Sequence, residues 1–358
     1  MRVGVLPAVG NGLVHFQKQG QLPRLLAHLE AYGGLATYFS YMDDRGLWPD
    51  RLGRLVAPQR PVRSQLRYAL TRPLRERGAF RECDVLRCTS LLGAIPAIVA
   101  KAMYWIPFVF SHGADYIRIA QIHGRSRLHV QKWRALRAVA MRMAAAVIVQ
   151  NEAMGAKLRA EYPMARIVHI PNWVDTDHFK PAYALKDVKT VLYVGRLVEE
   201  KNLRTLALAC ATVGATLTCL GEGPLRETLE GFCAISRSVK VRLPGAVPWG
   251  ALPRWYPEHA VFAMVSKTEG HCKALAEAMA AGMTCLVSKA VTEGMRAGHN
   301  CLSVDPDETS IALGLEVLFT DRDFAVRLGT EARKTAVQLW SKQTVLDQEI
   351  RLLRSVTR

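Results

Sequence analysis

Two glutamates, Glu269 and Glu277, have the types and spacing best suited to chemistry in this sequence, and seven residues separate them. Glu269 follows residues 261–266, an apolar run of the length of a buried strand. Glu277 lies within residues 273–281, nearly all strong helix formers, and Gly282 follows where a helix would end. We therefore expect Glu269 in a loop at the carboxyl end of a strand, beside the N-terminus of a helix that carries Glu277. Open parallel sheets bind ligands at this edge, and helix N-termini attract phosphate. The alternative interpretation is that both glutamates are merely solvated.

Two cations, Arg196 and Lys201, stand in a predicted loop between an apolar strand, residues 190–194, and the next helix. Fixed cations at the end of a strand can stabilise the negative charge that develops on a departing diphosphate. Gly195 opens this loop. A second turn, from Gly10 to Gly12, follows the first predicted strand and would let backbone approach a phosphate, although it lacks the third glycine of a dinucleotide fingerprint. Two exposed, solvated cations are the alternative interpretation of Arg196 and Lys201.

A histidine, His112, directly follows another predicted buried strand, residues 108–110, and so stands at a carboxyl-terminal sheet edge as well. A structural or helix-capping histidine is the alternative. Asp175 and Asp177 form a D-x-D pattern that some metal-dependent enzymes use. The same pattern recurs at residues 305–307 and 321–323, so it carries little information, and we assign residues 175–177 to a linker. No metal and no cofactor is expected.

The motifs together resemble those of the retaining glycosyltransferases of family 4, which have the GT-B fold. The resemblance is carried by E-x7-E at residues 269–277, G-R-L-x-x-E-K-N at 195–202, G-x-G-P at 221–224, and the segment IPNWVD at 170–175. Trp173 replaces the glycine usual in that last segment. The resemblance is strong over residues 190–290 and weak over the first eighty.

The resemblance implies roles for individual residues. Glu269 would lie beside the donor sugar, and Glu277 would hydrogen-bond the ribose hydroxyls of the nucleotide. His112 would contact the donor sugar or the reacting phosphate region. The expected catalytic residues are thus His112, Arg196, Lys201 and Glu269, and the expected donor-binding residues are Gly10, Gly12, Gly195, Arg196, Lys201, Glu269, Gly270, His271, Cys272 and Glu277.

The predicted fold class is α/β, because apolar strands alternate with helices along the chain, which is typical of parallel sheets. At 358 residues the chain is long enough for two domains. The resemblance implies GT-B architecture, with two Rossmann-like domains facing each other across a cleft. We expect an acceptor-binding domain at residues 1–178 and a nucleotide-sugar-binding domain at 179–340. A long final helix, about 323–352, would cross back, so that residues 341–358 pack on the first domain.

The net charge is +17, and residues 1–178 carry +13 of it. Ten arginines lie between residues 51 and 87, and leucines interleave with them as in a cationic amphipathic helix. Such a surface suits an anionic membrane or an anionic acceptor, and nucleic acid is disfavoured because no recognition motif accompanies the charge. A merely solvated basic surface is the alternative.

Residues 91–110 are hydrophobic but contain Pro96, Lys101 and Pro107, which favours a buried helix and strand over a membrane span. Eight cysteines without a C-x-x-C pair indicate reduced thiols. The sequence begins directly with a predicted strand, without the pattern of a signal peptide. The predicted location is the cytoplasm, with the inner face of the cytoplasmic membrane as a peripheral alternative.

The predicted function is transfer of a sugar from a nucleoside-diphosphate sugar to an acceptor hydroxyl, with retention of anomeric configuration. The expected partners are the nucleotide-sugar donor and a glycan or lipid-linked acceptor, in polysaccharide, glycolipid or lipopolysaccharide assembly. A sugar-nucleotide 2-epimerase and a non-catalytic module that binds nucleotide sugar or membrane are the alternatives.

Overall fold

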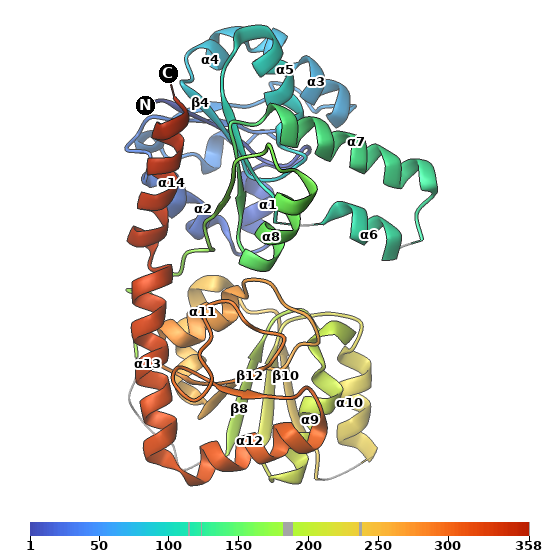
Figure 1. Cartoon of the computed structure of the whole chain (residues 1–358), viewed down its shortest axis with the longest axis vertical. Coiled ribbons are helices and arrows are strands. Elements are labelled where there is room, and N and C mark those ends of the chain that lie inside the picture. The colour runs from blue at the N-terminus through green and yellow to red at the C-terminus, as the bar shows by residue number, and fades with distance from the viewer. Residues whose placement is uncertain (114, 123, 182–188, 236–237, 358) are drawn as a thin grey trace. The chain divides into compact units, whose positions relative to one another are not determined.

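The computed structural model describes residues 1–113, 115–122, 124–181, 189–235 and 238–357. The chain forms two compact units: the first comprises Met1–Pro171 with Leu346–Arg358, and the second Asn172–Val345. The sequence-based divisions were placed after residue 178 and before residue 341. Each unit contains one parallel sheet with helices on it (Figure 1).

The first sheet has seven strands in the order β3-β2-β1-β4-β5-β6-β7, all parallel. The strands are β1 (Val3–Leu6), β2 (Ala36–Phe39), β3 (Gly53–Val56), β4 (Val85–Cys88), β5 (Phe108–Ser111), β6 (Ala146–Val149) and β7 (Ile167–His169). The strand order reverses direction between β1 and β4. The loops that follow these two strands therefore diverge at one sheet edge, which is where open α/β sheets bind ligands.

The helices of the first unit are α1 (Leu13–Lys18), α2 (Leu22–Glu30), α3 (Gln65–Arg75), α4 (Arg77–Arg81), α5 (Ala94–Tyr104), α6 (Tyr116–Ile122), α7 (Arg127–Met143), α8 (Glu152–Glu161) and the end of α14 (Lys342–Val356). Short 3₁₀ turns occupy Arg45–Leu47 and Asp50–Leu52. Leu86 and Cys88 of β4 share a core with residues of α4, α5 and α7. Arg87, between them, points to the other sheet face, where it meets α14.

The second sheet has six parallel strands in the order β10-β9-β8-β11-β12-β13. They are β8 (Thr190–Val194), β9 (Thr216–Leu220), β10 (Lys240–Gly245), β11 (Val261–Met264), β12 (Thr284–Ser288) and β13 (Leu302–Val304). Here the order reverses between β8 and β11. Two Rossmann-like units with parallel sheets confirm the predicted fold class.

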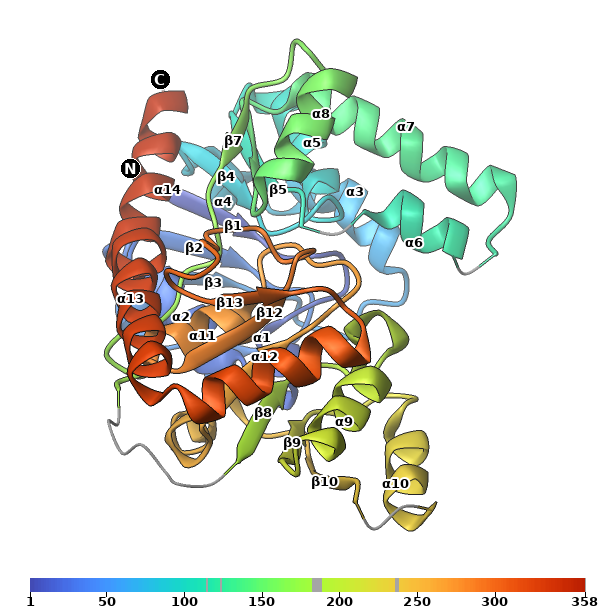
Figure 2. The same ribbon diagram turned by 60° about the horizontal axis from the view of Figure 1, so that its bottom comes forward.

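The helices of the second unit are α9 (Leu203–Thr212), α10 (Arg226–Ile235), α11 (Lys273–Ala280), α12 (Glu308–Thr320) and α13 (Arg322–Trp340), with 3₁₀ turns η3 (Glu199–Lys201), η4 (Trp249–Arg254) and η5 (Tyr256–Glu258). Helix α9 packs beside α12, and α11 packs beside α13 (Figures 1 and 2). The turns η4 and η5 lie between β10 and β11 in the chain.

The single helix predicted for residues 323–352 is wrong. The chain forms two helices, α13 and α14, and Ser341 between them has an extended ψ of 147°. The amide of Lys342 donates to the carbonyl of Val174, and the amide of Val174 donates to the carbonyl of Trp340. The segment that enters the second unit therefore takes hydrogen bonds that a continuous helix would have used, a tertiary effect that local propensity does not report.

Arg72 and Arg87 of the cluster at residues 51–87, together with Arg137 further along the first unit, are not surface charges, contrary to the sequence-based interpretation of the basic surface. Arg72 is fully buried: it donates to the carbonyls of Phe39 and Val56 and pairs with Glu76. Arg137 is also buried and ion-pairs with Glu161. A buried guanidinium needs such partners, since an unpaired buried charge is very costly.

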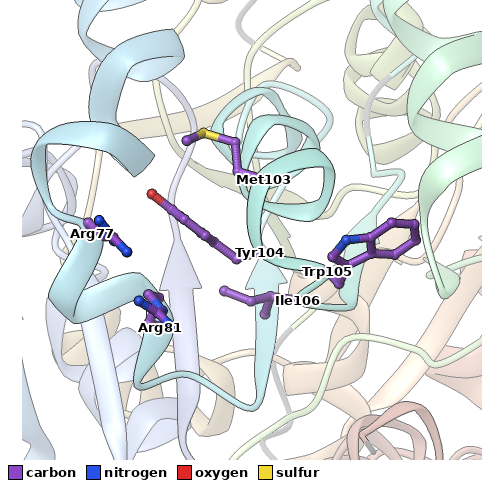
Figure 3. Close-up of a pocket in the computed structure, with 6 residues that line it drawn as sticks. All are labelled: Arg77, Arg81, Met103, Tyr104, Trp105 and Ile106. Carbon is purple, nitrogen blue, oxygen red and sulfur yellow. The ribbon is translucent and has the colours of Figure 1, made fainter.

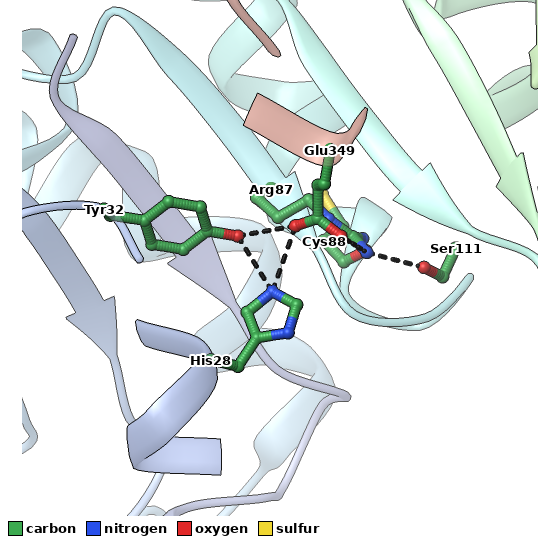
Figure 4. A network of polar contacts seen from close by, with 6 residues as sticks. All are labelled: His28, Tyr32, Arg87, Cys88, Ser111 and Glu349. Carbon is green, nitrogen blue, oxygen red and sulfur yellow. Dashed lines mark hydrogen bonds and ion pairs between the residues drawn. The ribbon is translucent and has the colours of Figure 1, made fainter. Parts of the chain in front are cut away.

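The third is Arg87, which belongs to a buried network that ties α14 to the first sheet (Figure 4). Its guanidinium donates to both carboxylate oxygens of Glu349, at 2.9 and 3.1 Å, and to the hydroxyl of Ser111 at 2.8 Å. The hydroxyl of Tyr32 donates to Glu349 at 2.6 Å, and His28 lies 3.1 Å from the same oxygen. Burial alone would raise the pKa of Glu349, but Arg87 and His28 hold it well below its usual range.

Residues 91–110 form α5 and β5, which confirms the helix-and-strand interpretation of that hydrophobic region. Nowhere in the part of the chain that the structure describes is a helix both long and apolar enough to cross a bilayer. The described cysteines are free thiols, namely Cys83, Cys88, Cys210, Cys219, Cys272, Cys285 and Cys301.

Candidate functional site

The candidate site lies at the carboxyl edge of the second sheet, where β8 and β11 are neighbours. The loop after β8 contains residues 195–202, and the loop after β11 contains residues 265–272. The strand order reverses between β8 and β11, so these loops lead to opposite faces of the sheet, as at the ligand-binding edge of open α/β sheets. The amide of Lys267 donates to the carbonyl of Glu200 at 2.9 Å, which joins the two loops directly.

Lys201 and Glu269 meet across this edge. The Lys201 ammonium donates to Oε2 of Glu269, and the hydroxyl of Ser266 lies 3.3 Å from the same oxygen. Their side chains are only 15% and 14% exposed, so solvent screens the pair weakly. An ammonium has three N–H donors, so Lys201 can bind Glu269 and still donate to an anion.

The N-terminus of α11 follows Glu269 and faces the same edge. The N-cap residue of α11, Cys272, makes no side-chain capping hydrogen bond, and the first turn of the helix carries no acidic residue. The positive end of the helix dipole there attracts an anion. Gly270 is exposed and its amide lies 3.3 Å from Oε1 of Glu269. The ring of His271 packs edge-on against Trp340 with centroids 4.9 Å apart.

Cys272 is the residue that immediately precedes α11, and it is half-buried. Burial and the nearby charge of Glu269 raise the pKa of its thiol to about 12. The thiol is therefore neutral at physiological pH. A neutral thiol is a weak nucleophile, which leaves Cys272 as part of the wall of the site.

Glu277 lies inside α11, as predicted, and is 4% exposed. The indole N–H of Trp249 donates to its Oε1 at 3.1 Å, and the hydroxyl of Tyr256 donates to its Oε2 at 3.1 Å. Both oxygens of the carboxylate are thus oriented by neighbouring side chains. Trp249 and Tyr256 were not singled out from the sequence, because only the 3₁₀ turns η4 and η5 bring them over α11.

Arg196 has an exposed side chain, while its carbonyl accepts from the hydroxyl of Tyr193 at 2.8 Å. Gly195, just before it, has φ +155°. A Cβ added to Gly221 would lie 1.9 Å from the Gly195 carbonyl oxygen. The two glycine turns therefore pack backbone to backbone and fix where the Arg196 loop leaves β8.

In the first unit, Gly10 and Gly12 follow β1, at the point where that strand order reverses. Gly10 has φ +87°, and Gly12 precedes α1. The buried carboxylate of Asp44 accepts from the amide of Leu13 at 2.5 Å and from the amide of Val14 at 3.1 Å. The first amides of α1 are thus already occupied by a carboxylate. Asp44 was missed from the sequence because it follows a different strand, β2.

His112 follows β5 and is 3% exposed. Its amide donates to the carbonyl of Ile148, while its Nδ1 is buried without a hydrogen-bond partner among the described residues. Burial, and secondarily the charge of Arg137, lower the pKa of this imidazole. His112 is therefore neutral at physiological pH and holds a spare ring nitrogen.

Asp175 accepts from the backbone amides of Asp177 and His178, at 3.1 and 2.9 Å, in a local turn. Among the described residues no group of three or more His, Cys, Asp and Glu side chains is placed to hold a metal ion. The structure thus assigns residues 175–177 to the chain that enters the second unit.

Comparison with known proteins decides the family. Residues 188–321 match a family model described as Glycosyl transferases group 1, and residues 24–178 match one described as Glycosyltransferase Family 4. The two matches together span most of the chain. The chain belongs to the glycosyltransferases described by these two models, group 1 and family 4. The residues that match the group 1 model include Arg196, Lys201, Glu269 and Glu277. The candidate site therefore lies within the matched segment.

Individual relatives of this family member are distant. A GDP-mannose-dependent alpha-(1-6)-phosphatidylinositol monomannoside mannosyltransferase from Mycobacterium tuberculosis is 29% identical over 211 residues, 51% of this chain and 54% of the relative. The chain therefore spans about half the length of the curated relatives it matches. Sucrose-phosphate synthase from Thermosynechococcus elongatus is 18% identical with a TM-score of 0.78, over 99% of this chain and 98% of that one. HepE of Anabaena, solved with UDP and glucose, is 17% identical with a TM-score of 0.76, over 99% and 100%. These structures support the GT-B fold.

Proposed function

We propose that this protein transfers a sugar from a nucleoside-diphosphate sugar to an acceptor hydroxyl. The observation that carries the proposal is the contact between Lys201 and Glu269 at the edge where β8 and β11 diverge. It places a cation and a carboxylate at one edge of the second sheet, where the N-terminus of α11 follows Glu269. A diphosphate linked to a sugar needs all three kinds of group.

Each group has a task that follows from its chemistry. Lys201, Arg196 and the first amides of α11 stabilise the negative charge that grows on the departing diphosphate. Glu269 accepts hydrogen bonds from the hydroxyls of the donor sugar. Glu277, which Trp249 and Tyr256 hold in one orientation, accepts hydrogen bonds from the ribose hydroxyls.

In the proposed reaction the bond between the anomeric carbon and the diphosphate oxygen breaks, and the acceptor oxygen bonds to the same face of that carbon. The acceptor proton passes to the departing diphosphate, which leaves as the nucleoside diphosphate. Anomeric configuration is therefore retained, as the family motifs led us to expect. The neutral His112 of the first unit donates or accepts one hydrogen bond at the donor sugar in this scheme, and the turn of Gly10 and Gly12 contributes backbone contacts to the donor.

GDP-mannose and UDP-glucose are the first donors to test. The mycobacterial relative is described as GDP-mannose-dependent, and HepE was solved with UDP and glucose. The acceptor we propose is a glycan or a lipid-linked glycan, because the same relative is named for a phosphatidylinositol mannoside. An anionic membrane is a proposed further partner of the first unit, and no metal or cofactor is assigned.

The experiment is an assay of nucleotide release and product formation with a panel of nucleotide sugars and a lipid extract as acceptor. We expect turnover with one base, and an anomeric proton in the product whose coupling matches that of the donor. Lys201→Ala and Arg196→Ala should each lower kcat by about 10²–10³. Arg204→Ala, on the next helix, is the matched control and should retain wild-type turnover.

Other outcomes would contradict the proposal in distinct ways. Turnover of the sugar nucleotide without any acceptor would indicate an epimerase. Tight donor binding without transfer to any acceptor would indicate a binding module. Wild-type turnover in both Lys201→Ala and Arg196→Ala would remove the assigned roles.

A further inference from the structure

Exposed apolar side chains gather on one part of the first unit. Of the fifteen large apolar side chains exposed in the described residues, five belong to α3 or to the end of α5. They are Leu66, Leu70 and Leu74, with exposures of 55%, 46% and 58%, and Met103 and Trp105, with 39% and 63%. The leucines are four residues apart and so form one stripe along α3. These five residues are called the apolar surface below.

The two parts of the apolar surface are joined. The hydroxyl of Tyr104 donates to the carbonyl of Pro73 at 3.0 Å, which ties the end of α5 to α3 beside Leu74. A pocket of about 400 Å³ continues from there and is lined by Arg77, Arg81 and residues 103–106. In Figure 3 the two arginines lie together on one side, Tyr104 and Ile106 lie between, and Trp105 points away from the arginines.

Trp105 has an unusual backbone for its position. It ends α5 in the left-handed conformation, with φ 60° and ψ 18°, where glycine is the preferred residue. Its indole is nevertheless exposed rather than packed in the core. The conformation therefore holds a large aromatic ring out from the surface, and tryptophan is among the side chains most suited to the interface between water and lipid.

The charge around the apolar surface is positive. The exposed arginines on α3, on α4 and just before α3 are Arg63, Arg67, Arg75, Arg77 and Arg81. Nearby acidic groups are already paired: Glu76 binds Arg72 and the hydroxyl of Tyr68, and Glu82 binds Arg54. A leucine stripe flanked by exposed cations complements a surface that is apolar inside and anionic outside.

We propose that the apolar surface, with Arg77 and Arg81, docks the protein on an anionic lipid bilayer. The leucines, Met103 and Trp105 enter the boundary between headgroups and acyl chains, and the two arginines bind lipid phosphates. A nucleic acid would satisfy the cations but leave the leucine stripe in water. The proposal does not depend on the sugar-transfer chemistry, because none of these residues belongs to the candidate site.

The test is sedimentation of the full-length protein with vesicles of phosphatidylcholine alone or containing about 30% phosphatidylglycerol. We expect binding to the anionic vesicles, weakened by salt. The double variant Arg77→Gln with Arg81→Gln should bind about 30-fold more weakly. Its control, Arg351→Gln with Arg354→Gln, makes the same charge change at two exposed arginines of α14, on the opposite face of the sheet, and should bind much as wild type does.

Trp105→Gly separates docking from folding, because glycine suits the left-handed backbone at this position. We expect it to reduce vesicle binding about tenfold while the protein stays folded. Leu313→Ser, at an exposed leucine of α12, is the matched control and should not reduce binding. Indifference of the wild type to anionic vesicles at low salt would overturn the proposal, as would equal losses in both arginine double variants. Vesicle indifference combined with self-association through the same residues would point instead to a second protein chain.

Discussion

At the scale of single residues, the best-defined element of the candidate site is Glu277. Each of its two oxygens accepts a hydrogen bond from a neutral side chain, one from Trp249 and the other from Tyr256. The carboxylate is therefore held in one orientation inside α11. Burial and the charge of Glu277 raise the pKa of Tyr256 well above its usual range, so the phenol remains a donor at any physiological pH.

Tyr256→Phe should weaken donor binding about tenfold, since a hydrogen bond to a charged group contributes on the order of 1.5–3 kcal/mol and its loss frees Glu277 to rotate. Isothermal titration with the active nucleoside diphosphate measures this. Tyr162→Phe removes a phenol oxygen that Arg137 contacts in the first unit and is the matched control. Unchanged affinity in Tyr256→Phe would show that Glu277 does not contact the nucleotide.

The lowered pKa of His112 gives stability a dependence on pH. Above about pH 6.5 this histidine is neutral in both the folded and the unfolded chain. Below that pH the unfolded chain binds a proton that the buried ring binds less readily, so the free energy of unfolding falls as pH falls, by at most about 1.4 kcal/mol per pH unit.

His112→Gln should therefore reduce the loss of stability between pH 7.5 and pH 5.5, as measured by urea unfolding. His299→Gln, at an exposed histidine, is the control and should leave the wild-type dependence in place. The account of His112 fails if the wild type and His112→Gln lose stability in parallel.

At the scale of elements, the loops of the site depend on glycines that face backbone. Gly221→Ala would place a Cβ 1.9 Å from the Gly195 carbonyl oxygen, at a residue whose φ is +146°. We expect this change to lower the free energy of unfolding of the second unit by about 3 kcal/mol or more, and to displace the Arg196 loop.

Gly231→Ala is the control for this glycine, since a Cβ there meets nothing within 4 Å in the middle of α10. It should raise stability by about 0.5–1 kcal/mol, because alanine is the better helix former. Thermal unfolding of both variants provides the comparison. Equal stability of Gly221→Ala and the wild type would contradict the packing described for the two turns.

The end of α5 provides a second prediction at this scale. Trp105→Gly and Trp105→Ala both remove the indole, but only glycine relieves the left-handed backbone. The glycine variant should therefore be the more stable of the two by about 1 kcal/mol in chemical denaturation. If the two variants unfold together, the backbone of Trp105 is not strained.

Local sequence signals predicted the strands of the second unit well, because apolar, β-branched runs are decisive over short distances. Residues 190–194 form β8 at the predicted bounds. The prediction that Glu269 follows a buried strand and that Glu277 lies inside the next helix is also confirmed. These are statements about a residue and its near neighbours in the chain.

Contacts between distant segments could not be predicted in the same way. The pairing of Lys201 with Glu269 depends on β8 lying beside β11, which requires knowledge of the strand order. The burial of Arg72 was misjudged because a helical wheel shows only which residues share a face. It does not show that the carbonyls of Phe39 and Val56 lie where they accept hydrogen bonds from this side chain. The carboxylate of Asp44 at α1 is a third contact of this kind.

At the scale of the whole molecule, the chain leaves the first unit at residue 171 and returns to it at residue 346. Glu349 on the returning helix is buried against His28, Tyr32 and Arg87, all of the first unit. Removing its charge would leave the Arg87 guanidinium buried without a counterion. The last thirteen residues thus complete the first unit's polar interior.

Glu349→Gln should lower the free energy of unfolding of the first unit by about 3–5 kcal/mol. Because the pKa of Glu349 is held well below its usual range, its contribution is complete above about pH 4.5 and is lost as pH falls through the lowered value. Hydrogen exchange should show faster exchange in the first unit while the second is unaffected. Glu316→Gln, an exposed change on α12, is the control. Uniform acceleration in both units would contradict this assignment.

The measurement that tests the central claim most directly is hydrogen–deuterium exchange of the protein as GDP or UDP is added. If the nucleotide binds where the strand order reverses between β8 and β11, amides of residues 195–202 and 266–275 become protected together. Lys201→Ala should then abolish this protection. Saturable binding of either nucleotide with protection confined to other segments, or protection unchanged in Lys201→Ala, would contradict the account.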